Sequence, residues 1–299
     1  MRKQELTIAI CTFNRAELLI ETINALASLK SIEKAEVIIV DNNSTDGTKN
    51  EVEKLINKLN YKLDYTNEKK QGLSYARNTA IQKSTCKYIA FLDDDAIPTV
   101  EWIDSIIDAF EGDSELYAIG GKIIPKFEVS RPEWLVTGLE YSYTIVDLGV
   151  EKKQYPSGLY PFGANMAFRT AVFEKYKFPN HLGRKGTTLI SGEETWLFGK
   201  IEEEDWGYCY IPNMIVEHFV PKERLKKEWV LERFYFQGVT KKLMCTSKKD
   251  TIKLLAETFL KSVYVGIKKP FLKKEGYVLL NECRKNSVRG SFDYLIGKK

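Results

Sequence analysis

Residues 87–98 read KYIAFLDDDAIP. Positions 88–92 form an apolar run with the length of a buried strand, and three aspartates follow it at positions 93–95. Adjacent carboxylates repel one another, so an acidic triplet beside a buried strand lowers stability unless a positive charge compensates it. The stretch therefore raises two questions: what kind of sheet holds this strand, and which cation accompanies the acids.

The chain before this stretch alternates apolar strand-like runs with segments that carry apolar residues at helical spacing. This alternation predicts an α/β fold in which a mostly parallel, Rossmann-like central sheet is flanked by helices. We expect strands at residues 6–12, 35–41, 62–67 and 88–92, and helices at residues 15–29, 49–59 and 72–84.

Polar side chains stand at the carboxyl ends of three of these strands. Thr12 ends the first strand, Asp41 ends the second, and the acids at positions 93–95 follow the fourth. Ligands of open α/β sheets bind beyond the carboxyl ends of the strands. The sequence therefore predicts that these polar clusters converge on one crevice.

The second half of the chain has a mixed pattern. A proline, Pro212, interrupts one of its apolar stretches, and the segment from Lys222 onward has helical periodicity in at least two parts that meet near residues 268–270. We therefore expect a C-terminal helical extension. Strands are expected at residues 117–125 and 160–173, which carry a Gly-Ala-Asn turn, and as a pair broken at the proline over residues 207–219.

Charge divides the chain near Pro221. The sequence of 299 residues carries 45 Lys and Arg against 41 Asp and Glu, a formal net charge of +4. Residues 222–299 hold 20 basic and 8 acidic residues, a balance of +12, whereas the preceding part has a balance of −8. We therefore predict a main α/β domain over residues 1–221 and a basic amphipathic helical extension over residues 222–299.

Composition indicates a soluble globular protein. Hydrophobic residues make up 43% and charged residues 29% of the chain. The five cysteines are scattered without CxxC spacing, which is typical of reduced thiols in a cytoplasmic protein and argues against a disulfide framework or a zinc site. The sequence has no run of about 18 apolar residues, so we expect no membrane-spanning helix.

The acidic triplet is a candidate site for a divalent cation. Mg²⁺ and Mn²⁺ prefer carboxylate oxygens and often bridge to substrate phosphates, which would relieve the repulsion among the acids. The alternative is a solvated acidic turn. His218 is a candidate further ligand because imidazole binds ions such as Mn²⁺, although a lone histidine at a strand end is more often structural. Arg77, on the helix before the acidic strand, is available for a phosphate or a base edge.

A second acidic site stands in SGEETWLFGKI, residues 191–201. Glu193 and Glu194 follow a glycine at the start of a predicted helix, and Trp196 comes soon after them. A carboxylate placed against an aromatic side chain has a raised pKa and can serve as a general base. The alternative is that the pair stabilises the first helical turn through the macrodipole.

Other enzyme classes lack their motifs in this sequence. No GxGxxG follows the first strand, and neither a GxxxxGK[ST] phosphate loop nor a GxSxG elbow occurs. The lysines of the basic tail are interleaved with Leu, Phe, Tyr and Val at helical spacing, which favours an amphipathic surface helix over a nucleic-acid site. We expect no nucleic-acid partner.

Five segments, in order, resemble glycosyltransferase family 2, whose members have the GT-A fold. They are AICTFNRAELLIETINAL, VIIVDNNSTDGT, GLSYARNTAI, YIAFLDDDAIP and SGEETWLFGKI, and GANMAFRTAVF is similar to the segment that lines the sugar site. The match runs from about residue 6 to residue 218. The resemblance implies an enzyme of the bacterial cell-surface polysaccharide type, with residues 1–221 as its catalytic domain.

The resemblance also implies a role for each motif. Glu194, or its neighbour Glu193, would be the general base, although the family commonly has Asp at that place. Many members have Pro where this chain has Cys11. The implied residues are Thr12, Phe13, Arg15, Asp41, Arg77, Asp93 and Asp94 for the nucleotide; Asp95, Asp93 and His218 for Mn²⁺ or Mg²⁺; and Gly163, Ala164, Asn165 and Trp196 for the sugar or acceptor.

The implied reaction is an inverting, metal-dependent transfer of a sugar from a nucleoside-diphosphate sugar to a hydroxyl of a glycan or lipid-linked acceptor. UDP is the favoured donor nucleotide, with GDP and TDP as alternatives. One rival interpretation is a sugar nucleotidyltransferase, but the loop CTFNRAELL lacks the expected glycine- and arginine-rich character. The other is a non-catalytic scaffold that binds a nucleotide sugar.

The basic tail has two interpretations. Segments such as FLKSVYVGIKKPFLKK, residues 259–274, can hold a cytoplasmic protein at the anionic inner face of a cell membrane, near a lipid-linked acceptor. The alternative is a helical appendage that packs on the catalytic domain and keeps its lysines in water.

Overall fold

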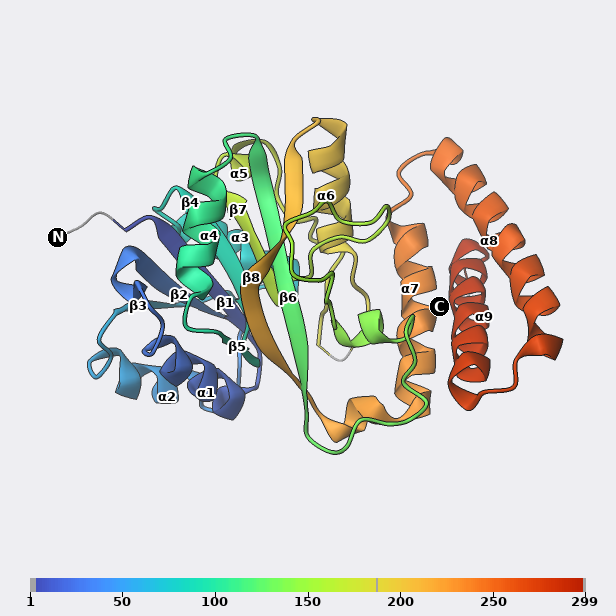
Figure 1. Ribbon diagram of the computed structural model, residues 1–299, viewed down its shortest axis with the longest axis horizontal. Coiled ribbons are helices and arrows are strands. Elements are labelled where there is room, and N and C mark those ends of the chain that lie inside the picture. Colours follow the sequence, from blue (N-terminus) through green and yellow to red (C-terminus); the bar gives the residue numbers. More distant parts are fainter. Residues whose placement is uncertain (1–3, 187, 298–299) are drawn as a thin grey trace. The chain divides into compact units, whose positions relative to one another are not determined.

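The structure, a computed structural model, describes residues 4–186 and 188–297 (Figure 1). The chain forms two compact units. The second unit takes in two segments that precede the predicted boundary at Pro221, and the assignment of residues 1–221 to one catalytic domain stays a prediction. The first unit comprises Met1–Lys126, Val146–Asn180 and Glu194–Phe219, and the second comprises Phe127–Ile145, His181–Glu193 and Val220–Lys299.

An eight-stranded mixed sheet has the strand order β3-β2-β1-β4-β7-β6-β8-β5. The first four strands in this order are parallel, whereas β7 is antiparallel to both β4 and β6, and β5 is antiparallel to β8. The α/β class is confirmed, but only half of the sheet is a parallel block. The strands are β1 (Leu6–Thr12), β2 (Ala35–Asp41), β3 (Lys62–Asn67), β4 (Tyr88–Asp93), β5 (Ala96–Pro98), β6 (Leu116–Phe127), β7 (Asn165–Arg169) and β8 (Gly207–Val220).

The strand register places the predicted polar strand ends at one edge of the sheet. Thr12 of β1 pairs with Asp41 of β2, and Cys11 of β1 pairs with Asp93 of β4. Parallel strands that pair in this register have their carboxyl ends side by side. The predicted convergence of the polar clusters is therefore confirmed for the strand ends.

Helices cover both faces of the sheet because side chains alternate along each strand. On one face, Ile8 and Val37 belong to a core that includes residues of α1 and α4, and α4 crosses in front of the strands in Figure 1. On the other face, Ala9 and Ile38 belong to a core with residues of α3, α5 and α6. The elements are α1 (Ala16–Leu26), η1 (Ile32–Lys34), α2 (Thr48–Ile56), α3 (Leu73–Lys83), α4 (Trp102–Glu111), α5 (Val172–Lys175) and α6 (Glu193–Glu203).

Two predicted strands differ from the observed elements. Within residues 160–173 only Asn165–Arg169 forms a strand, and the apolar end of the segment begins the short helix α5 instead. Residues 207–219 form one continuous strand instead of a broken pair. Pro212 removes a single backbone donor and its fixed φ fits an extended chain, so it does not end the strand.

The second unit contains the expected C-terminal helices. A core that includes Leu139, Val230 and Cys283 joins them. Helices α7 and α9 approach closely, because a Cβ on Gly238 would lie 1.9 Å from the backbone oxygen of Ser287. No helix within residues 4–186 and 188–297 is long and apolar enough to cross a membrane. The elements are η2 (Glu140–Tyr143), η3 (Lys222–Leu225), α7 (Lys227–Leu243), α8 (Lys248–Lys268), η4 (Lys269–Phe271) and α9 (Glu275–Leu295).

Candidate active site

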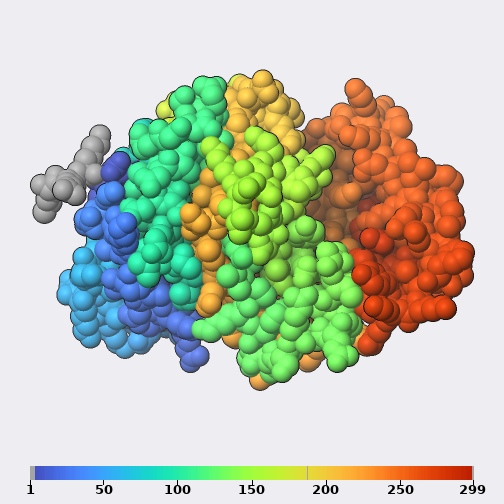
Figure 2. Space-filling model, viewed as in Figure 1, coloured from blue at the N-terminus to red at the C-terminus, as the bar shows by residue number. Residues whose placement is uncertain are grey.

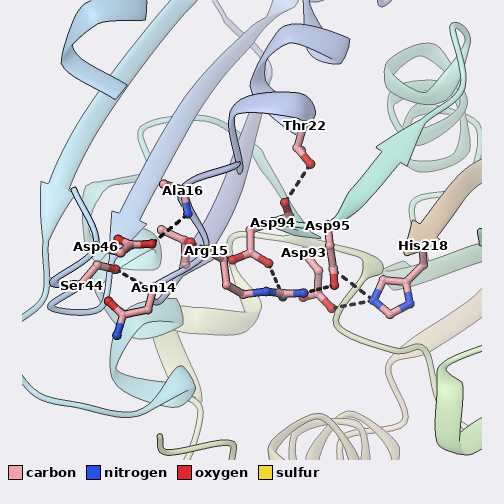
Figure 3. Close-up of polar contacts among 11 residues, drawn as sticks. Asn14, Arg15, Ala16, Thr22, Ser44, Asp46, Asp93, Asp94, Asp95 and His218 are labelled. Atoms are coloured by element: carbon pink, nitrogen blue, oxygen red, sulfur yellow. Dashed lines mark hydrogen bonds and ion pairs between the residues drawn. The ribbon is translucent and has the colours of Figure 1, made fainter. Parts of the chain in front are cut away.

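The acidic triplet meets an arginine from the loop between β1 and α1 (Figure 3). Asp94 is 3% exposed, and its carboxylate accepts hydrogen bonds from the Thr12 hydroxyl at 2.7 Å and from Arg15 Nη1 at 2.6 Å. Arg15 Nη2 donates to Asp95 Oδ2 at 2.5 Å, so one guanidinium bridges two of the acids. The backbone oxygen of Asp94 also accepts a hydrogen bond from Thr22 Oγ1 of α1 at 2.9 Å. The chain therefore supplies its own cation to the acidic triplet.

The loop that carries Arg15 is held by the turn after β2. Asn14 has a φ of 52°, in the left-handed region that Asn tolerates better than most residues. Its backbone N–H donates to Ser44 Oγ at 2.8 Å, and its side-chain oxygen accepts from the Thr45 N–H at 2.7 Å. These contacts fix the backbone next to Arg15, so its side chain starts from a defined position.

Asp93 and Asp95 form a second cluster with His218 of β8, next to the same turn (Figure 3). His218 Nε2 lies 3.2 Å from Asp95 Oδ1 and 3.8 Å from Asp93 Oδ2, and ligand atoms of the three residues lie within 4.8 Å of one another. Pairing of β5 with β8 produces this contact, because it sets His218 opposite Ala96. Two carboxylates and an imidazole suit a divalent cation, and the imidazole favours Mn²⁺ over Mg²⁺. The predicted cation ligands are thus brought together.

The buried acids of this turn have raised pKa values. Burial raises the pKa of Asp94 to about 7, although Arg15 lowers it. Burial is also the largest cause that raises the pKa of Asp93, and the Asp95 carboxylate is the next. A divalent cation in the cluster would favour the charged forms of these acids, because an opposite charge nearby offsets the lost hydration.

Arg77 of α3 contacts the predicted general base. Its side chain is 3% exposed and lies over the rings of Phe178 and Phe91, with centroids at 5.3 and 5.8 Å. Its Nη1 donates to Glu194 Oε1 at 3.0 Å, and the Glu194 side chain keeps an exposed fraction of 18%. Burial is the largest cause of the raised pKa of Asp93. Among the charged groups, Arg77 lowers this pKa and Glu194 raises it. The pair therefore acts on the same site as the acidic triplet.

Gly163 leaves room for this pair. A Cβ at that position would lie 1.9 Å from Arg77 Nη2 and 2.7 Å from Glu194 Oε1. Both distances are far below a van der Waals contact, so any side chain would displace the pair. Gly163, predicted beside the sugar, is thus placed directly against the predicted base.

Ala164 and Asn165 lie inside the fold, at 1% and 0% exposure. The Asn165 side chain accepts a hydrogen bond from Trp102 Nε1 at 2.8 Å, and it donates to the backbone oxygens of Met214 at 2.8 Å and Lys122 at 2.9 Å. The amide therefore joins neighbouring elements of the sheet. Contact of these two residues with a sugar or acceptor stays a prediction.

Asp41 is fixed at the end of β2. It is 2% exposed, and its carboxylate accepts hydrogen bonds from the Tyr65 hydroxyl at 2.6 Å and the Ser44 N–H at 2.8 Å. Phe13 is half-buried in the loop that leads to Arg15. Both residues lie at the carboxyl ends of neighbouring strands, as expected, and their contact with a nucleotide stays a prediction.

Glu193 and Trp196 take different positions on α6 from Glu194. Glu193 is 2% exposed, whereas Trp196 is half-buried and meets the Tyr176 ring edge-on at 6.3 Å. Residues two apart in a helix do not face the same way, so Trp196 is directed away from Glu194. The charged partner of Glu194 is Arg77, which the sequence motifs assign to the nucleotide.

Sequence reasoning missed three supporting residues: Thr22, Phe178 and Tyr65. Thr22 holds the backbone of Asp94, and Phe178 stacks on Arg77. Both act through partners that are distant in sequence, so no pattern in the sequence marks them. Only Tyr65 had a signal, because it stands two residues before the end of a strand that pairs with β2.

Residues 7–177 match the family described as Glycosyl transferase family 2. The chain belongs to this family. The match spans more than half of the sequence and includes the strands and loops that hold the acidic triplet. The expected family and enzyme class are confirmed: the protein is a glycosyltransferase.

Curated relatives of this glycosyltransferase cover most of its length. A glucosyl-dolichyl phosphate glucuronosyltransferase of Haloferax volcanii is 24% identical over 251 residues, which are 80% of this chain and 77% of the relative. The succinoglycan biosynthesis protein ExoM of Rhizobium meliloti is 26% identical over 235 residues, 78% of this chain and 72% of the relative. Glycosyltransferase AglE of Haloferax volcanii is 30% identical over 253 residues, 78% and 77% of the two chains.

Solved structures share the fold of this glycosyltransferase. The mannosyltransferase PcManGT of Pyrobaculum calidifontis, in complex with GDP-Man and Mn²⁺, matches with a TM-score of 0.65 at 18% identity, over 100% of this chain and 89% of that one. S. aureus TarS 1–349 in complex with UDP matches with a TM-score of 0.51 at 17% identity, over 98% and 92% of the two chains. These likenesses confirm the GT-A fold.

Proposed function

We propose that this glycosyltransferase moves a hexose from a nucleoside-diphosphate sugar to a hydroxyl of a glycan or lipid-linked acceptor, with a divalent cation and with inversion at the anomeric carbon. The observation that carries the proposal is the cluster of Asp93, Asp95 and His218 in the same site as Glu194. The cluster suits a cation bound to a diphosphate, and Glu194 suits a base for the acceptor.

The strand ends of β1 and β2 form the nucleotide side of the site in this proposal. Thr12, Phe13 and Asp41 lie there, and Arg15 can donate to a phosphate because its side chain is 29% exposed. UDP is the favoured donor nucleotide and GDP the alternative. Two structures of the same fold, TarS with UDP and PcManGT with GDP-Man, support UDP and GDP as candidate donor nucleotides.

The cation would be held by Asp93, Asp95 and His218. It would supply Lewis acidity that stabilises the negative charge of the departing nucleoside diphosphate. The imidazole donor favours Mn²⁺ over Mg²⁺ in this role. Arg15 holds Asp94 and Asp95 in position from the opposite side of the turn.

Glu194 is the general base of the proposed reaction. It takes the proton of the acceptor hydroxyl as that oxygen bonds to the anomeric carbon and the bond to the diphosphate breaks, so one displacement inverts the centre. The transition state has oxocarbenium character. Arg77 keeps the carboxylate oriented through its hydrogen bond. Glu194 is preferred to Glu193 because its side chain is 18% exposed, whereas Glu193 is 2% exposed.

The acceptor belongs to cell-surface glycan assembly in this proposal. The names of two relatives, a succinoglycan biosynthesis protein and a glucosyl-dolichyl phosphate glucuronosyltransferase, support a polysaccharide or a lipid-linked acceptor. The enzyme would act at the cytoplasmic side of a cell membrane. The 20 basic against 8 acidic residues of positions 222–299 support contact with an anionic surface.

Thermal unfolding with UDP, GDP, TDP and CDP, each with and without Mn²⁺, tests the donor site. One nucleotide should raise the melting temperature, and only with the cation, because a ligand that binds the native state stabilises it. Asp95→Asn should abolish this shift. A shift that survives in D95N, or that needs no cation, would contradict the proposed cation site.

The variants Glu194→Gln and Glu193→Gln test the base and separate the enzyme from a non-catalytic scaffold. Release of the nucleoside diphosphate from the donor, in the presence of acceptor, should fall by about 10²–10⁴-fold in E194Q. The nucleotide-dependent thermal shift should stay in both variants. An E193Q loss as large as that of E194Q would move the role to Glu193. Wild-type protein that binds a nucleotide sugar but releases no nucleotide with any acceptor tested would favour the scaffold.

A further inference from the structure

Helix α8 exposes large apolar side chains. Ile252, Phe259 and Leu260 are each 67% exposed and Ile267 is 62% exposed, while Phe271 in the following turn η4 reaches 74%. In Figure 2, residues of α8, coloured orange, are visible at the molecular surface. Single exposed apolar residues are common, but a row of them along one helix marks an interaction surface.

These exposed residues lie opposite the side of α8 that packs. Three α8 residues are buried: Leu254, Thr258 and Val265. On that side Asn281 Nδ2 of α9 donates to the backbone oxygen of Val265 at 3.2 Å. Successive helical residues are about 100° apart, so the exposed set projects on average from the far side of the helix. We call this set the α8 stripe: Ile252, Phe259, Leu260, Val263 and Ile267.

Two sets of contacts hold α8 despite its small buried face. Ser247 and Asp250 form a complete capping box at its first turn. Lys261 Nζ donates to Ser287 Oγ of α9 at 3.0 Å. The α8 stripe is therefore displayed by a capped helix that α9 holds along its other side.

Lysines accompany the α8 stripe. Residues 248–274 contain eight lysines, against two acids, Asp250 and Glu257. Lysine is depleted at protein–protein interfaces but typical of helices that lie in the surface of an anionic membrane. The charge therefore complements lipid phosphates better than it complements the surface of a protein. The exposed lysines are Lys248, Lys249, Lys253, Lys268, Lys269, Lys273 and Lys274.

We propose that the α8 stripe, with Phe271 of η4, docks on an anionic lipid bilayer. This proposal rests on the proposed function, because a lipid-linked acceptor would bring the enzyme to a membrane. The stripe is about 23 Å long from Ile252 to Ile267, at about 1.5 Å per residue. The helix lies in the plane of the membrane interface and does not cross the bilayer. Lys253 and Glu257 divide it into apolar segments that are too short to span a membrane. The apolar side chains enter the headgroup boundary, and the lysines bind lipid phosphates.

Co-sedimentation of the full-length protein with vesicles tests the docking surface. The probes are vesicles of phosphatidylcholine alone and of phosphatidylcholine with phosphatidylglycerol, at low and high salt. We expect binding to be about tenfold or more tighter with the anionic lipid and to weaken in salt, which screens charge. Wild-type protein that ignores the anionic vesicles would overturn the proposal.

The double variant Phe259→Asp with Leu260→Asp separates the α8 stripe from charge alone. It should bind anionic vesicles at least about tenfold more weakly, because apolar burial contributes to interfacial binding and added carboxylates oppose it. Val150→Asp is the matched control, since Val150 is 89% exposed in the first unit, and its binding should stay within about twofold of wild type. Equal binding by the double variant and V150D would show that the α8 stripe is not the docking surface.

A second copy of the chain is the other occupant that the test must separate. If size-exclusion chromatography finds a wild-type dimer that the F259D/L260D variant converts to monomer, and vesicles are not bound, the surface is an oligomer interface and the proposal is wrong. The nucleotide-dependent thermal shift is measured on the same samples. If wild-type protein shows the thermal shift but does not bind vesicles, only the docking proposal is wrong. If it binds vesicles but shows no thermal shift, only the proposed function is contradicted.

Discussion

The two compact units differ in how they accommodate cations that are fully or partly buried. In the first unit, Arg77 is 3% exposed and donates to Glu194, and Arg15 bridges Asp94 and Asp95. A carboxylate in contact offsets part of the hydration that a buried cation loses. Burial acts to lower the pKa of Arg15, but the aspartates of the acidic triplet outweigh it and raise that pKa.

The second unit holds Lys261 of α8 in a different environment. Its Nζ donates to the Ser287 hydroxyl at 3.0 Å. Burial first, and then Lys241 and Arg284, lower the pKa of Lys261 to about 8, while Glu257 acts in the other direction. The comparison suggests that the arginines of the first unit are retained for their contacts with carboxylates, whereas the lysine costs stability while it is charged.

Arg77→Met should have the largest effect, because it leaves Glu194 without this guanidinium in a mostly buried position. We expect the free energy of unfolding to fall by about 3 kcal/mol and turnover to fall by about 100-fold. The nucleotide-dependent thermal shift should persist if Arg77 acts on the base. Arg131→Met is the control: Arg131 is 42% exposed beside Glu140, and its loss should cost less than about 1 kcal/mol. Denaturant titration measures both, and similar losses would break the comparison.

Arg15→Met should cost less, because Arg15 is 29% exposed and water can approach the freed acids. We expect a loss of about 2 kcal/mol without added cation, since Asp94 and Asp95 then repel each other with no guanidinium between them. Mn²⁺ should recover more stability in R15M than in wild type, because it takes over part of the compensation. Melting curves with and without Mn²⁺ measure this. Lys126→Met, which removes an exposed ion pair with Glu21, is the control and should show the wild-type response to Mn²⁺.

Gly163→Ala should disturb the base without removing any charge. The new Cβ would lie 1.9 Å from Arg77 Nη2, so the Arg77–Glu194 contact must shift. We expect a loss of about 1–2 kcal/mol in stability and about tenfold or more in turnover. Gly199→Ala is the matched control: it lies in α6 with no atom within 4 Å of its Cβ, and it should be neutral or slightly stabilising. Full activity of G163A would contradict the placement of Gly163 beside the base.

The parallel half of the sheet could be predicted from the sequence because its rules are local. The runs at residues 6–12 and 35–41 coincide with β1 and β2, since apolar runs bounded by polar turns are sufficient to mark buried parallel strands. The sequence predicts a longer strand than the observed antiparallel β7, because the segment that contains it is apolar on both sides of the strand end. Periodicity alone does not separate such a strand from a short helix.

The composition of the candidate site could be predicted, but its pairing could not. The motifs identify Arg15, Arg77 and Glu194 as site residues. They predict that both arginines bind a nucleotide, and they do not predict the contacts of these arginines with carboxylates. The observed partners of Arg15 are 79 and 80 residues away, and the partner of Arg77 is 117 residues away. Contacts of this range depend on how α1, α3 and α6 pack on the sheet, which no local pattern encodes.

Lys261→Met should give the smallest effect, with the opposite sign. The pKa of Lys261 is about 8 in the folded protein and 10.5 in an ordinary lysine. Between these two pH values Lys261 is protonated in the unfolded chain but has released its proton in the folded protein, so wild-type stability rises with pH across this window. Below it the charged lysine is penalised in full, and K261M should be about 1 kcal/mol more stable, allowing for partial exposure of the side chain. Denaturant titrations near pH 7 and pH 10 should show this advantage shrinking at the higher pH. Lys253→Met, at an exposed site on the same helix, should show neither the gain nor the pH dependence, and an equal gain there would mean that the added apolar side chain, and not the buried charge, is responsible.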